Sequence, residues 1–245
     1  MRARQRITTG IPGLDSMLRG GLPAGSTVLV SGAPGVGKTT LGLQYLVTGV
    51  AQGQPGLLVT FEAFPAMLVR DAQSLGWDLR ALEARGGLRL IFTSPEVFLQ
   101  GLQSPDSPLS ETIRAIAPQR AVLDNMTHFH RLTSDPVELR SIYHTLVNGL
   151  KREGMTSLLL DEVERLLGPQ SRHRSGLPFL VDAILLMRYV EVDSTIQRAM
   201  AVLKVRGSAH AREIRSFSIG PGGIQVGEPF GGREGILSGS PHRVA

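Results

Sequence analysis

The stretch GAPGVGKT, residues 32–39, restricts the fold of this 245-residue chain more than any other feature. It matches the G-x-x-x-x-G-K-[S/T] pattern of a phosphate-binding loop, and it lies between an apolar run typical of a buried strand (26–32) and a helical pattern (39–53), as that pattern requires. Glycines let the backbone close around phosphate oxygens, and the N–H groups at a helix start bind anions. Lys38 is expected to contact the β- and γ-phosphates, and the Thr39 hydroxyl to bind Mg²⁺. The motif therefore predicts a site for ATP and Mg²⁺ formed by Gly32, Ala33, Pro34, Gly35, Val36, Gly37, Lys38, Thr39 and Thr40.

Short apolar runs alternate with helical patterns along the first two thirds of the chain, which is typical of a parallel sheet covered on both faces. After residue 180 the pattern changes to apolar-rich segments joined by short turns, which favours antiparallel strands at one edge of the sheet. We predict a single α/β domain over 1–245, with a mostly parallel central sheet and a Gly-rich C-terminal tail (220–245). The predicted strands are 26–32, 56–62, 88–94, 120–125, 155–161, 181–192, 197–207 and 214–226; the predicted helices are 39–53, 65–76, 111–119 and 136–154; the predicted loops are 100–108 and 166–178.

The positive excess of the chain lies entirely in its last third. Residues 165–245 carry 11 Lys and Arg against 6 Asp and Glu, which equals the net charge of +5. Such a basic region is either a solvated face or the contact surface of an anionic partner. No apolar run approaches the ~20 residues of a membrane span, and the N-terminus lacks the apolar segment of a secretory signal. With no cysteine, disulfide and thiol chemistry are excluded, and we expect a cytoplasmic protein that does not bind membranes.

Two predicted strands end in acidic residues. Asp124 ends RAVLDN, where it can hold Mg²⁺ through water as a Walker B acid does, or else act as a turn or cap residue; the phosphate-binding loop favours the metal role. Asn125 orients water or substrate, or belongs to a turn. Asp161 and Glu162 end MTSLLLD and are either a nucleotide sensor or a helix cap.

Several segments together resemble the KaiC-type ATPases of the RecA superfamily. The resemblance covers nearly the whole chain. It implies a RecA-like fold, ATP hydrolysis, and a hexameric ring with nucleotide between adjacent subunits. Its N-terminal part, within residues 1–25, leads directly into the phosphate-binding loop. The segments that carry it are ITTGIPGLDSMLRGGLPAGSTVLVSGAPGVGKTTLGLQYL (7–46), VTFE (59–62), SLGWDL (74–79), AVLDN (121–125) and LKVRGSAH (203–210).

Glu62 is the candidate general base. In a RecA-like sheet, the strand that follows the P-loop helix is expected to lie next to the P-loop strand, so that its carboxyl end faces the γ-phosphate. A carboxylate in that place can orient and deprotonate the attacking water. The structural alternative is that Glu62 caps the helix that begins near Pro65.

The resemblance also implies that Lys204 and Arg206 act on a neighbour's nucleotide. The family carries a Lys-x-Arg-Gly segment on a late strand that reaches the γ-phosphate of the adjacent subunit, and cations there stabilise transition-state charge. Alternate residues of a strand share a face, so both side chains are expected to point the same way, with His210 close by. Without the resemblance, a solvated basic strand would be the preferred interpretation.

The chain departs from the family in three respects. Glu62 is followed by Ala63 where the family has a second glutamate, so hydrolysis should persist at an altered rate. The clock proteins of this family hold two tandem domains, whereas this chain holds one and would form a single ring. The phosphorylated Ser-Thr pair of their second domain falls here on Pro178 and Phe179, which have no hydroxyl, so clock-type autokinase activity is not expected.

Alternative functions follow from the same features. The chain could be a nucleotide-gated assembly module that recruits a signalling protein, with hydrolysis incidental, or a RecA/RadA-like DNA-dependent ATPase. Nucleic acid is the less favoured partner, because the aromatic residues of the basic third are scattered rather than interleaved with the basic ones. His128 and His130 could be a metal pair, but no third ligand lies at a sequence spacing typical of a metal site. Solvated or hydrogen-bonded histidines, or a segment that senses the nucleotide, are therefore the preferred interpretations.

Overall fold

The computed structural model describes residues 5–163, 176–231, 233–238 and 242–243. The basic part of the predicted loop 166–178, including Arg172 and Arg174, lies outside these ranges. In the described part of the chain, no helix combines the length and the apolar character that a membrane span needs.

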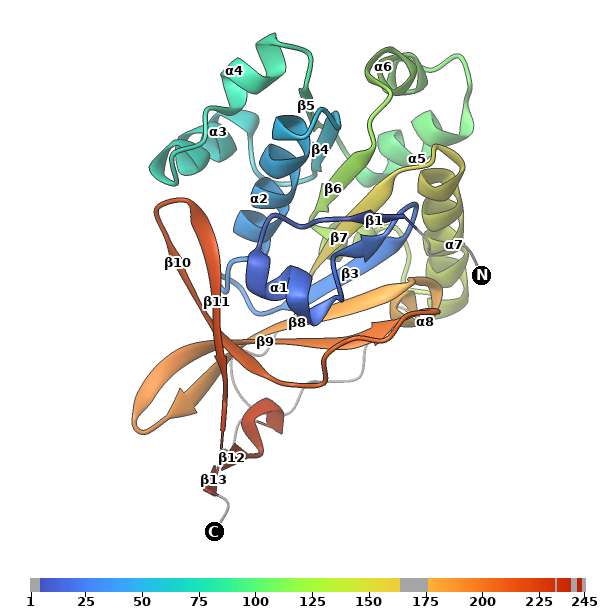
Figure 1. Cartoon of the computed structure of the whole chain (residues 1–245). Coiled ribbons are helices and arrows are strands. Elements are labelled where there is room, and N and C mark those ends of the chain that lie inside the picture. Colours follow the sequence, from blue (N-terminus) through green and yellow to red (C-terminus); the bar gives the residue numbers. More distant parts are fainter. Residues whose placement is uncertain (1–4, 164–175, 232, 239–241, 244–245) are drawn as a thin grey trace.

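A nine-stranded sheet forms the centre of the molecule, in the order β11-β10-β9-β8-β3-β7-β6-β4-β5 (Figure 1). The strands from β8 to β5 run parallel to one another, and β9, β10 and β11 add antiparallel pairs at the other edge, so the predicted mostly parallel sheet with an antiparallel C-terminal edge is confirmed. The strand bounds are β3 Thr27–Gly32, β4 Gly56–Thr60, β5 Leu88–Phe92, β6 Arg120–Asp124, β7 Thr156–Glu162, β8 Ala183–Val192, β9 Thr195–Val205, β10 Arg215–Gly220 and β11 Gly223–Pro229.

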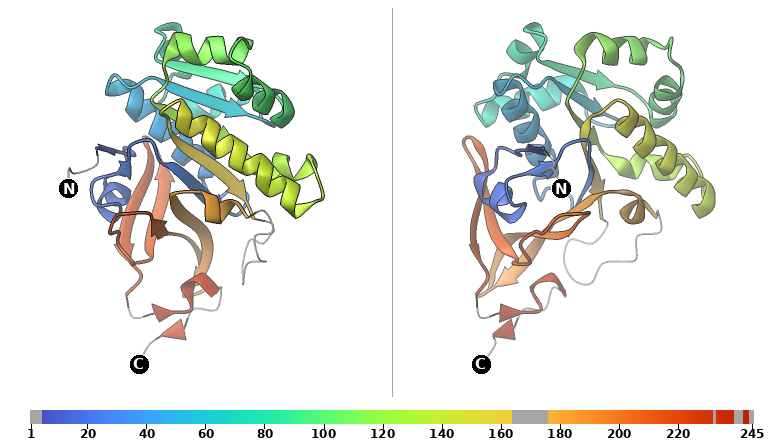
Figure 2. Two further views of the ribbon diagram at one scale, coloured as in Figure 1. Left: turned by 90° about the vertical axis from the view of Figure 1, so that its right-hand side faces the viewer. Right: turned by 45° about the vertical axis from the view of Figure 1, so that its right-hand side comes forward.

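Helices cover both faces of the parallel part (Figure 2). Successive strand residues pack into opposite layers: Val28 and Val30 belong to the core under α1, α2, α3 and α4, whereas Leu29 belongs to the core under α5, α6, α7 and α8. This alternation follows from the two-residue period of a strand, and burial on both faces explains why the strands are continuously apolar. The helix bounds are α1 Pro12–Met17, α2 Lys38–Ala51, α3 Pro65–Ser74, α4 Leu79–Ala84, α5 Pro95–Gln103, α6 Pro108–Ile116, α7 Pro136–Arg152 and α8 Leu177–Leu180.

Short elements complete the described structure. Two short antiparallel pairs lie apart from the main sheet, one near each end of the chain, and 3₁₀ turns follow β6 and precede the last short strand. Their bounds are β1 Arg6–Ile7, β2 Leu22–Pro23, η1 Met126–Arg131, β12 Arg233–Glu234, η2 Ile236–Ser238 and β13 His242–Arg243.

Proline and a capping side chain set the start of several helices. Asp135 accepts a hydrogen bond from the N–H of Val137 at the start of α7, and Ser94 caps α5 in the same way. Each cap is followed by proline at the first helical position, where its missing N–H costs nothing. The predicted loop 100–108 is therefore wrong at both ends: α5 extends to Gln103, and α6 begins at Pro108. The prediction also missed α1, α4 and most of α5.

The order of the strands corrects one expectation about Glu62. Strand β4, which follows the P-loop helix, does not lie next to the P-loop strand β3; β7 and β6 lie between them. A sequence pattern identifies strands but says little about which crossover places each of them in the sheet. All of these strands still end at the same edge, because they are parallel.

The C-terminal Gly-rich region starts inside a hairpin rather than as a tail. The β10–β11 hairpin lies beside α2 (Figure 1), where Gln44 accepts a hydrogen bond from the N–H of Ile224 at 2.7 Å. The N–H of Gly222 donates to the carbonyl of Leu75 at 3.0 Å. The hairpin therefore brings residue Ile219 to the phosphate-binding loop, since a Cβ on Gly37 would lie 2.5 Å from the Cδ1 of Ile219.

Arg120 anchors the opposite end of β6. Its side chain is fully buried, and its guanidinium carbon lies 4.5 Å from the ring centroid of Tyr45. The guanidinium donates to the carbonyl oxygens of Thr8 and Tyr45 and to Oε1 of Gln54, so its buried charge is fully engaged. Gly49 makes room for it, because a Cβ there would lie 2.3 Å from the Cδ of Arg120.

Candidate nucleotide-binding site

The carboxyl ends of β3, β4, β6 and β7 enclose a cavity of about 360 Å³ at one edge of the sheet. Such an edge is where ligands bind in open α/β sheets. The P-loop forms one wall, and the β10–β11 hairpin contributes one apolar side chain. The lining residues are Gly35, Gly37, Lys38, Thr39, Thr40, Thr60, Glu62, Ala63, Leu68, Asp71, Asp124, Asn125, Glu162 and Ile219.

The phosphate-binding loop has the backbone that its glycines permit. Gly35 and Gly37 have φ angles of 72° and 114°, in the left-handed region that other residues adopt at a cost. Gly37 directly precedes α2, so the unpaired N–H groups of the helix start face the loop. This arrangement is a ready anion site before any ligand binds.

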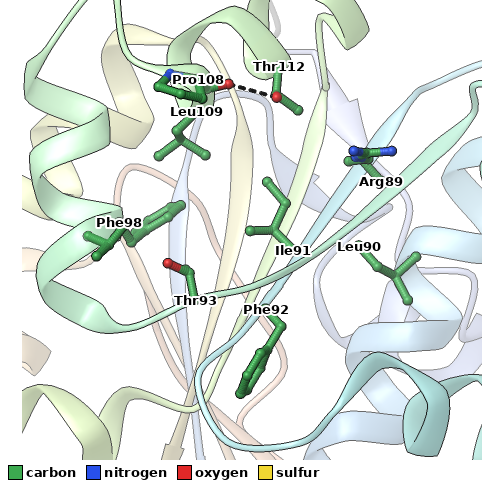
Figure 3. Close-up of a pocket in the computed structure, with 10 residues that line it drawn as sticks. Arg89, Leu90, Ile91, Phe92, Thr93, Phe98, Pro108, Leu109 and Thr112 are labelled. Atoms are coloured by element: carbon green, nitrogen blue, oxygen red, sulfur yellow. Dashed lines mark hydrogen bonds between the residues drawn. The ribbon is translucent and has the colours of Figure 1, made fainter.

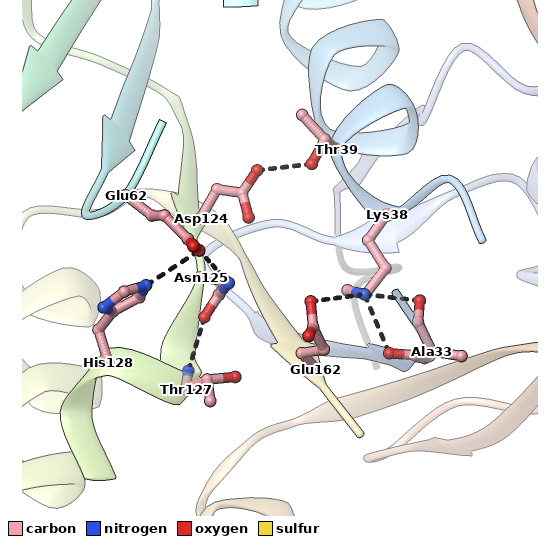
Figure 4. A network of polar contacts seen from close by, with 10 residues as sticks. Ala33, Lys38, Thr39, Glu62, Asp124, Asn125, Thr127, His128 and Glu162 are labelled. Carbon is pink, nitrogen blue, oxygen red and sulfur yellow. Dashed lines mark hydrogen bonds and ion pairs between the residues drawn. The ribbon is translucent and has the colours of Figure 1, made fainter. Parts of the chain in front are cut away.

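Lys38 is the first residue of α2 and is nearly fully buried. Its Nζ donates to the carbonyl oxygens of Gly32 and Ala33, each at 2.9 Å, and lies 3.8 Å from Oε2 of Glu162 (Figure 4). Burial lowers the pKa of the Lys38 amine, while the nearby carboxylates of Glu162, Asp124 and Asp161 oppose that shift. The Lys38 amine is already held in place by these contacts, and a phosphate oxygen would give it a further anionic partner.

Thr39 and Asp124, the two predicted metal ligands, come together on the floor of the cavity. The Thr39 hydroxyl donates to Oδ2 of Asp124 at 2.7 Å. Burial raises the pKa of the Asp124 carboxyl, and the Thr39 hydrogen bond and the Lys38 charge counteract this. A hydroxyl and a carboxylate are hard oxygen ligands of the kind that Mg²⁺ takes, and Mg²⁺ usually adds substrate phosphates and water rather than more side chains. Among the described residues, no group of three His, Cys, Asp or Glu side chains is placed to hold a metal ion.

Glu62 reaches the same cavity although β4 lies away from β3. The residue follows the end of β4, and the next strand, β6, brings Asp124 and Asn125 beside it. Its Oε2 lies 3.1 Å from Nε2 of His128 and 3.4 Å from Nδ2 of Asn125 (Figure 4). The capping interpretation is wrong, because Phe64 is the N-cap of α3 and no side chain caps that helix.

Lys204 and Arg206 lie together at the end of β9 but do not line this cavity. Lys204 donates to the carbonyls of Pro178 and Val181 at 3.1 and 2.8 Å, and Arg206 donates to the carbonyl of Phe179 at 2.9 Å. Burial, with the charge of Arg206, lowers the pKa of Lys204. The two cations therefore share a side of the strand, as expected, and contact the segment on which the family's phosphorylated pair would fall.

Two lining residues, Glu162 and Ile219, are not among the site residues predicted from the sequence. Glu162, for which a nucleotide sensor and a helix cap are the two sequence interpretations, lies on the cavity wall beside Lys38. Nothing in the sequence pointed to Ile219 as a site residue, because only the fold of the β10–β11 hairpin brings it to Gly37.

A second hollow of about 380 Å³ lies at the outer edge of the sheet, between β5, α5 and α6 (Figure 3). Its described lining is mainly apolar, with Arg89 as its charged residue, and it includes no carboxylate. The carboxylates needed to hold a metal ion line the P-loop cavity and not this hollow.

Asp161 supplies a pH-dependent contribution to stability. Burial raises the pKa of this carboxyl to about 7, and Lys38 opposes the rise. The folded protein therefore binds this proton more tightly than the unfolded chain, whose pKa is about 4, so the free energy of unfolding falls as pH rises from about 4 to 7. In nucleotide-free protein, Asp161→Asn should remove this loss. Its free energy of unfolding relative to the parent should increase by roughly 2–4 kcal/mol between pH 4.5 and pH 8.

Urea unfolding at several pH values measures this difference. Asp106→Asn is the matched control, since Asp106 is exposed between α5 and α6. Parallel pH profiles for the parent and Asp161→Asn would contradict the prediction.

Comparison with known proteins gives consistent matches. A family model described as the KaiC ATPase matches residues 7–230. The "Circadian clock oscillator protein KaiC" of Thermostichus vulcanus is 34% identical over 240 residues, covering 98% of this chain and 46% of that protein. The protein of the same name from Picosynechococcus sp. (strain ATCC 27264 / PCC 7002 / PR-6) is 32% identical, again over 98% of this chain and 46% of its own length. The chain thus spans about half the length of the curated relatives that it matches.

Proposed function

The chain belongs to the KaiC family of P-loop ATPases, and from this we propose that it binds Mg²⁺-ATP between neighbouring subunits of a homo-oligomeric ring and hydrolyses it to ADP and phosphate. A hexamer is the proposed assembly, with a regulatory or signalling role in the cytoplasm. Clock-type autokinase activity is not part of the proposal, because Pro178 and Phe179 offer no hydroxyl.

The charge of the P-loop cavity is the observation that carries this proposal. Its described lining includes one cation, Lys38, and four carboxylates, Glu62, Asp71, Asp124 and Glu162, for a formal sum of −3. A triphosphate brings several further negative charges. Binding it there requires positive charge from outside this lining, and a metal ion together with a neighbouring subunit would supply it.

The end of β9 in a neighbouring subunit is the proposed source of the positive charge that the protein adds to the cavity. Lys204 and Arg206 lie at the end of β9, outside the cavity of their own chain. The connection that follows and the start of β10 place His210, Arg212 and Arg215 around a hollow of about 450 Å³, where Glu213 pairs with Arg215. A surface of this charge complements a cavity that lacks cations, and a head-to-tail contact that closes into a ring would bring the two together.

The residues of the cavity have distinct proposed roles. The P-loop N–H groups and Lys38 hold the β- and γ-phosphates, and Thr39 and Asp124 would hold Mg²⁺, which when bound would neutralise charge on the phosphate oxygens. Glu62 accepts a proton from the water that attacks the γ-phosphorus, as the bond from that phosphorus to the β-γ bridging oxygen breaks and ADP leaves. Lys204 and Arg206 of a neighbour stabilise the charge on the transferred group.

Phosphate release and solution mass test the proposal. Purified protein should release phosphate from ATP with Mg²⁺ present, and EDTA should abolish the release, because Thr39 and Asp124 alone cannot replace the metal charge. Light scattering should show about six times the 26.4 kDa chain mass with Mg²⁺ and a non-hydrolysable ATP analogue. A monomer that hydrolyses ATP at a rate per subunit independent of concentration would contradict the interface site.

A further inference from the structure

We propose that His128 is a positioning residue for the general base: its imidazole donates a hydrogen bond to Glu62 and holds the carboxylate in the orientation that accepts a proton from water. The inference rests on the proposed function, since it assigns His128 a part in ATP hydrolysis. It is carried by the contact between Nε2 of His128 and Oε2 of Glu62 at 3.1 Å, with Asn125 3.4 Å from the same oxygen (Figure 4).

The Glu62 carboxylate needs a restraint. Its side chain is 68% exposed and follows the end of a strand, so without a partner it would sample several rotamers. A general base must instead lie within hydrogen-bond distance of the water that it deprotonates. The two polar contacts with His128 and Asn125 supply that restraint.

His128 is held rigidly enough to act as the fixed partner. Its side chain is only 14% exposed, and it belongs to η1. Asn125 begins this turn, and its Oδ1 accepts a hydrogen bond from the N–H of Thr127 at 2.9 Å. Met126 and Phe129, on either side of His128 in the turn, are fully buried. An imidazole on such a turn has little freedom to follow a moving carboxylate, so the carboxylate is the group that becomes ordered.

The backbone that carries Glu62 is tied to the same turn. The N–H of Phe61 donates to the carbonyl of Asp124 at 2.9 Å. The Phe61 ring packs edge-on against Phe129, with centroids 5.2 Å apart. The residue before Glu62 and the residue after His128 are therefore in contact, which fixes the distance between the base and its partner.

The geometry leaves one carboxylate oxygen for the reaction. Both donors contact Oε2, so Oε1 is the atom that can accept the proton from water. The contact requires that the Nε2 of His128 carry its hydrogen, so that the ring donates and the carboxylate accepts. His128 thus acts through Glu62 and does not itself touch the nucleotide in this proposal.

Three single variants test the role. We expect His128→Ala to lower kcat for ATP by about tenfold, with KM and the Kd for a non-hydrolysable ATP analogue within about twofold of the parent. His128→Gln keeps an N–H donor near the position of Nε2 and should recover most of the loss. His144→Ala, which removes an exposed histidine of α7, is the matched control and should match the parent.

A double variant separates this role from general damage. If His128 acts only through Glu62, then Glu62→Gln/His128→Ala should be no slower than Glu62→Gln alone. Nitrogen-15 spectra of the histidine rings give a readout without turnover, since Glu62→Gln should shift the His128 Nε2 signal, identified by its loss in His128→Ala.

Each outcome decides the question. A kcat for His128→Ala equal to or above that of the parent, or a double variant that multiplies the two losses, would overturn the role of His128 while leaving ATP hydrolysis by the parent in place. Absence of turnover by the parent would instead remove the proposed function, and the positioning role with it.

Discussion

Replacing Glu62 with glutamine is expected to lower ATP turnover by roughly 10²–10⁴-fold while Mg²⁺-ATP still binds, because the amide keeps the shape of the side chain but cannot accept a proton. Glu62 lies in the P-loop cavity and is held by His128 and Asn125, and it caps no helix. Its removal should therefore affect the chemical step rather than the fold. The measurement is kcat from phosphate release, together with the Kd for a non-hydrolysable analogue.

The control for this substitution is Glu153→Gln, which makes the same change on an exposed glutamate at the end of α7. Removing a carboxylate from a cavity rich in acids should also tighten triphosphate binding modestly, so a Kd equal to or below that of the parent is expected. Turnover equal to that of the parent would show that Glu62 is not the base, and Ala63 next to it could not replace it.

Mixing two inactive variants should restore activity if the site is shared between subunits. Arg206→Ala alone is expected to lower kcat by about 10³-fold, in the range of a missing arginine finger. In a ring assembled from equal amounts of Arg206→Ala and Glu62→Gln chains, about one quarter of the interfaces combine an intact Glu62 with an intact Arg206. Turnover of the mixture should then approach a quarter of the parent rate, far above that of either variant alone.

Subunit exchange makes this experiment decisive. The variants are mixed without nucleotide and assembled with Mg²⁺-ATP, and the matched control mixes Arg206→Ala with the double variant Glu62→Gln/Arg206→Ala, which cannot form a complete site. The exchange of Arg206 for Ala also removes its bond to the carbonyl of Phe179, so the unmixed variant is first checked for ring formation. A mixture no more active than its components, with mixed rings present, would place the function of Arg206 within its own chain.

The variants should behave differently in mixed rings because their side chains lie in different places. Glu62, Lys38 and Asp124 line one cavity of one chain, whereas Arg206 lies outside it. A substitution in the first group should abolish turnover at every interface where the altered chain supplies the P-loop. Substitution of Arg206 should instead abolish turnover at the site of the adjacent subunit, to which the altered chain would supply Arg206.

Residue type and spacing were enough to predict the elements that local chemistry specifies. The P-loop strand, its glycines and the α2 start follow from one eight-residue motif, and the apolar strands follow from burial on both faces. The placement of Thr39 beside Asp124 could also be inferred from the sequence, because the strands of a parallel sheet end at the same edge. The sequence pattern did not predict the strand order, in which β7 and β6 separate β3 from β4. The order depends on the crossover connections between strands rather than on the residues within each strand.

The contacts that join distant segments depend on how the whole chain packs. His128 meets Glu62 because β4 and β6 are neighbours and Phe61 packs on Phe129. Ile219 reaches Gly37 because the β10–β11 hairpin packs beside α2, and no local sequence preference predicts that contact. Residue type and spacing determine which groups can do chemistry, whereas packing of the whole chain determines which of them share one cavity, because side-chain contacts across the fold are made only when the layers close.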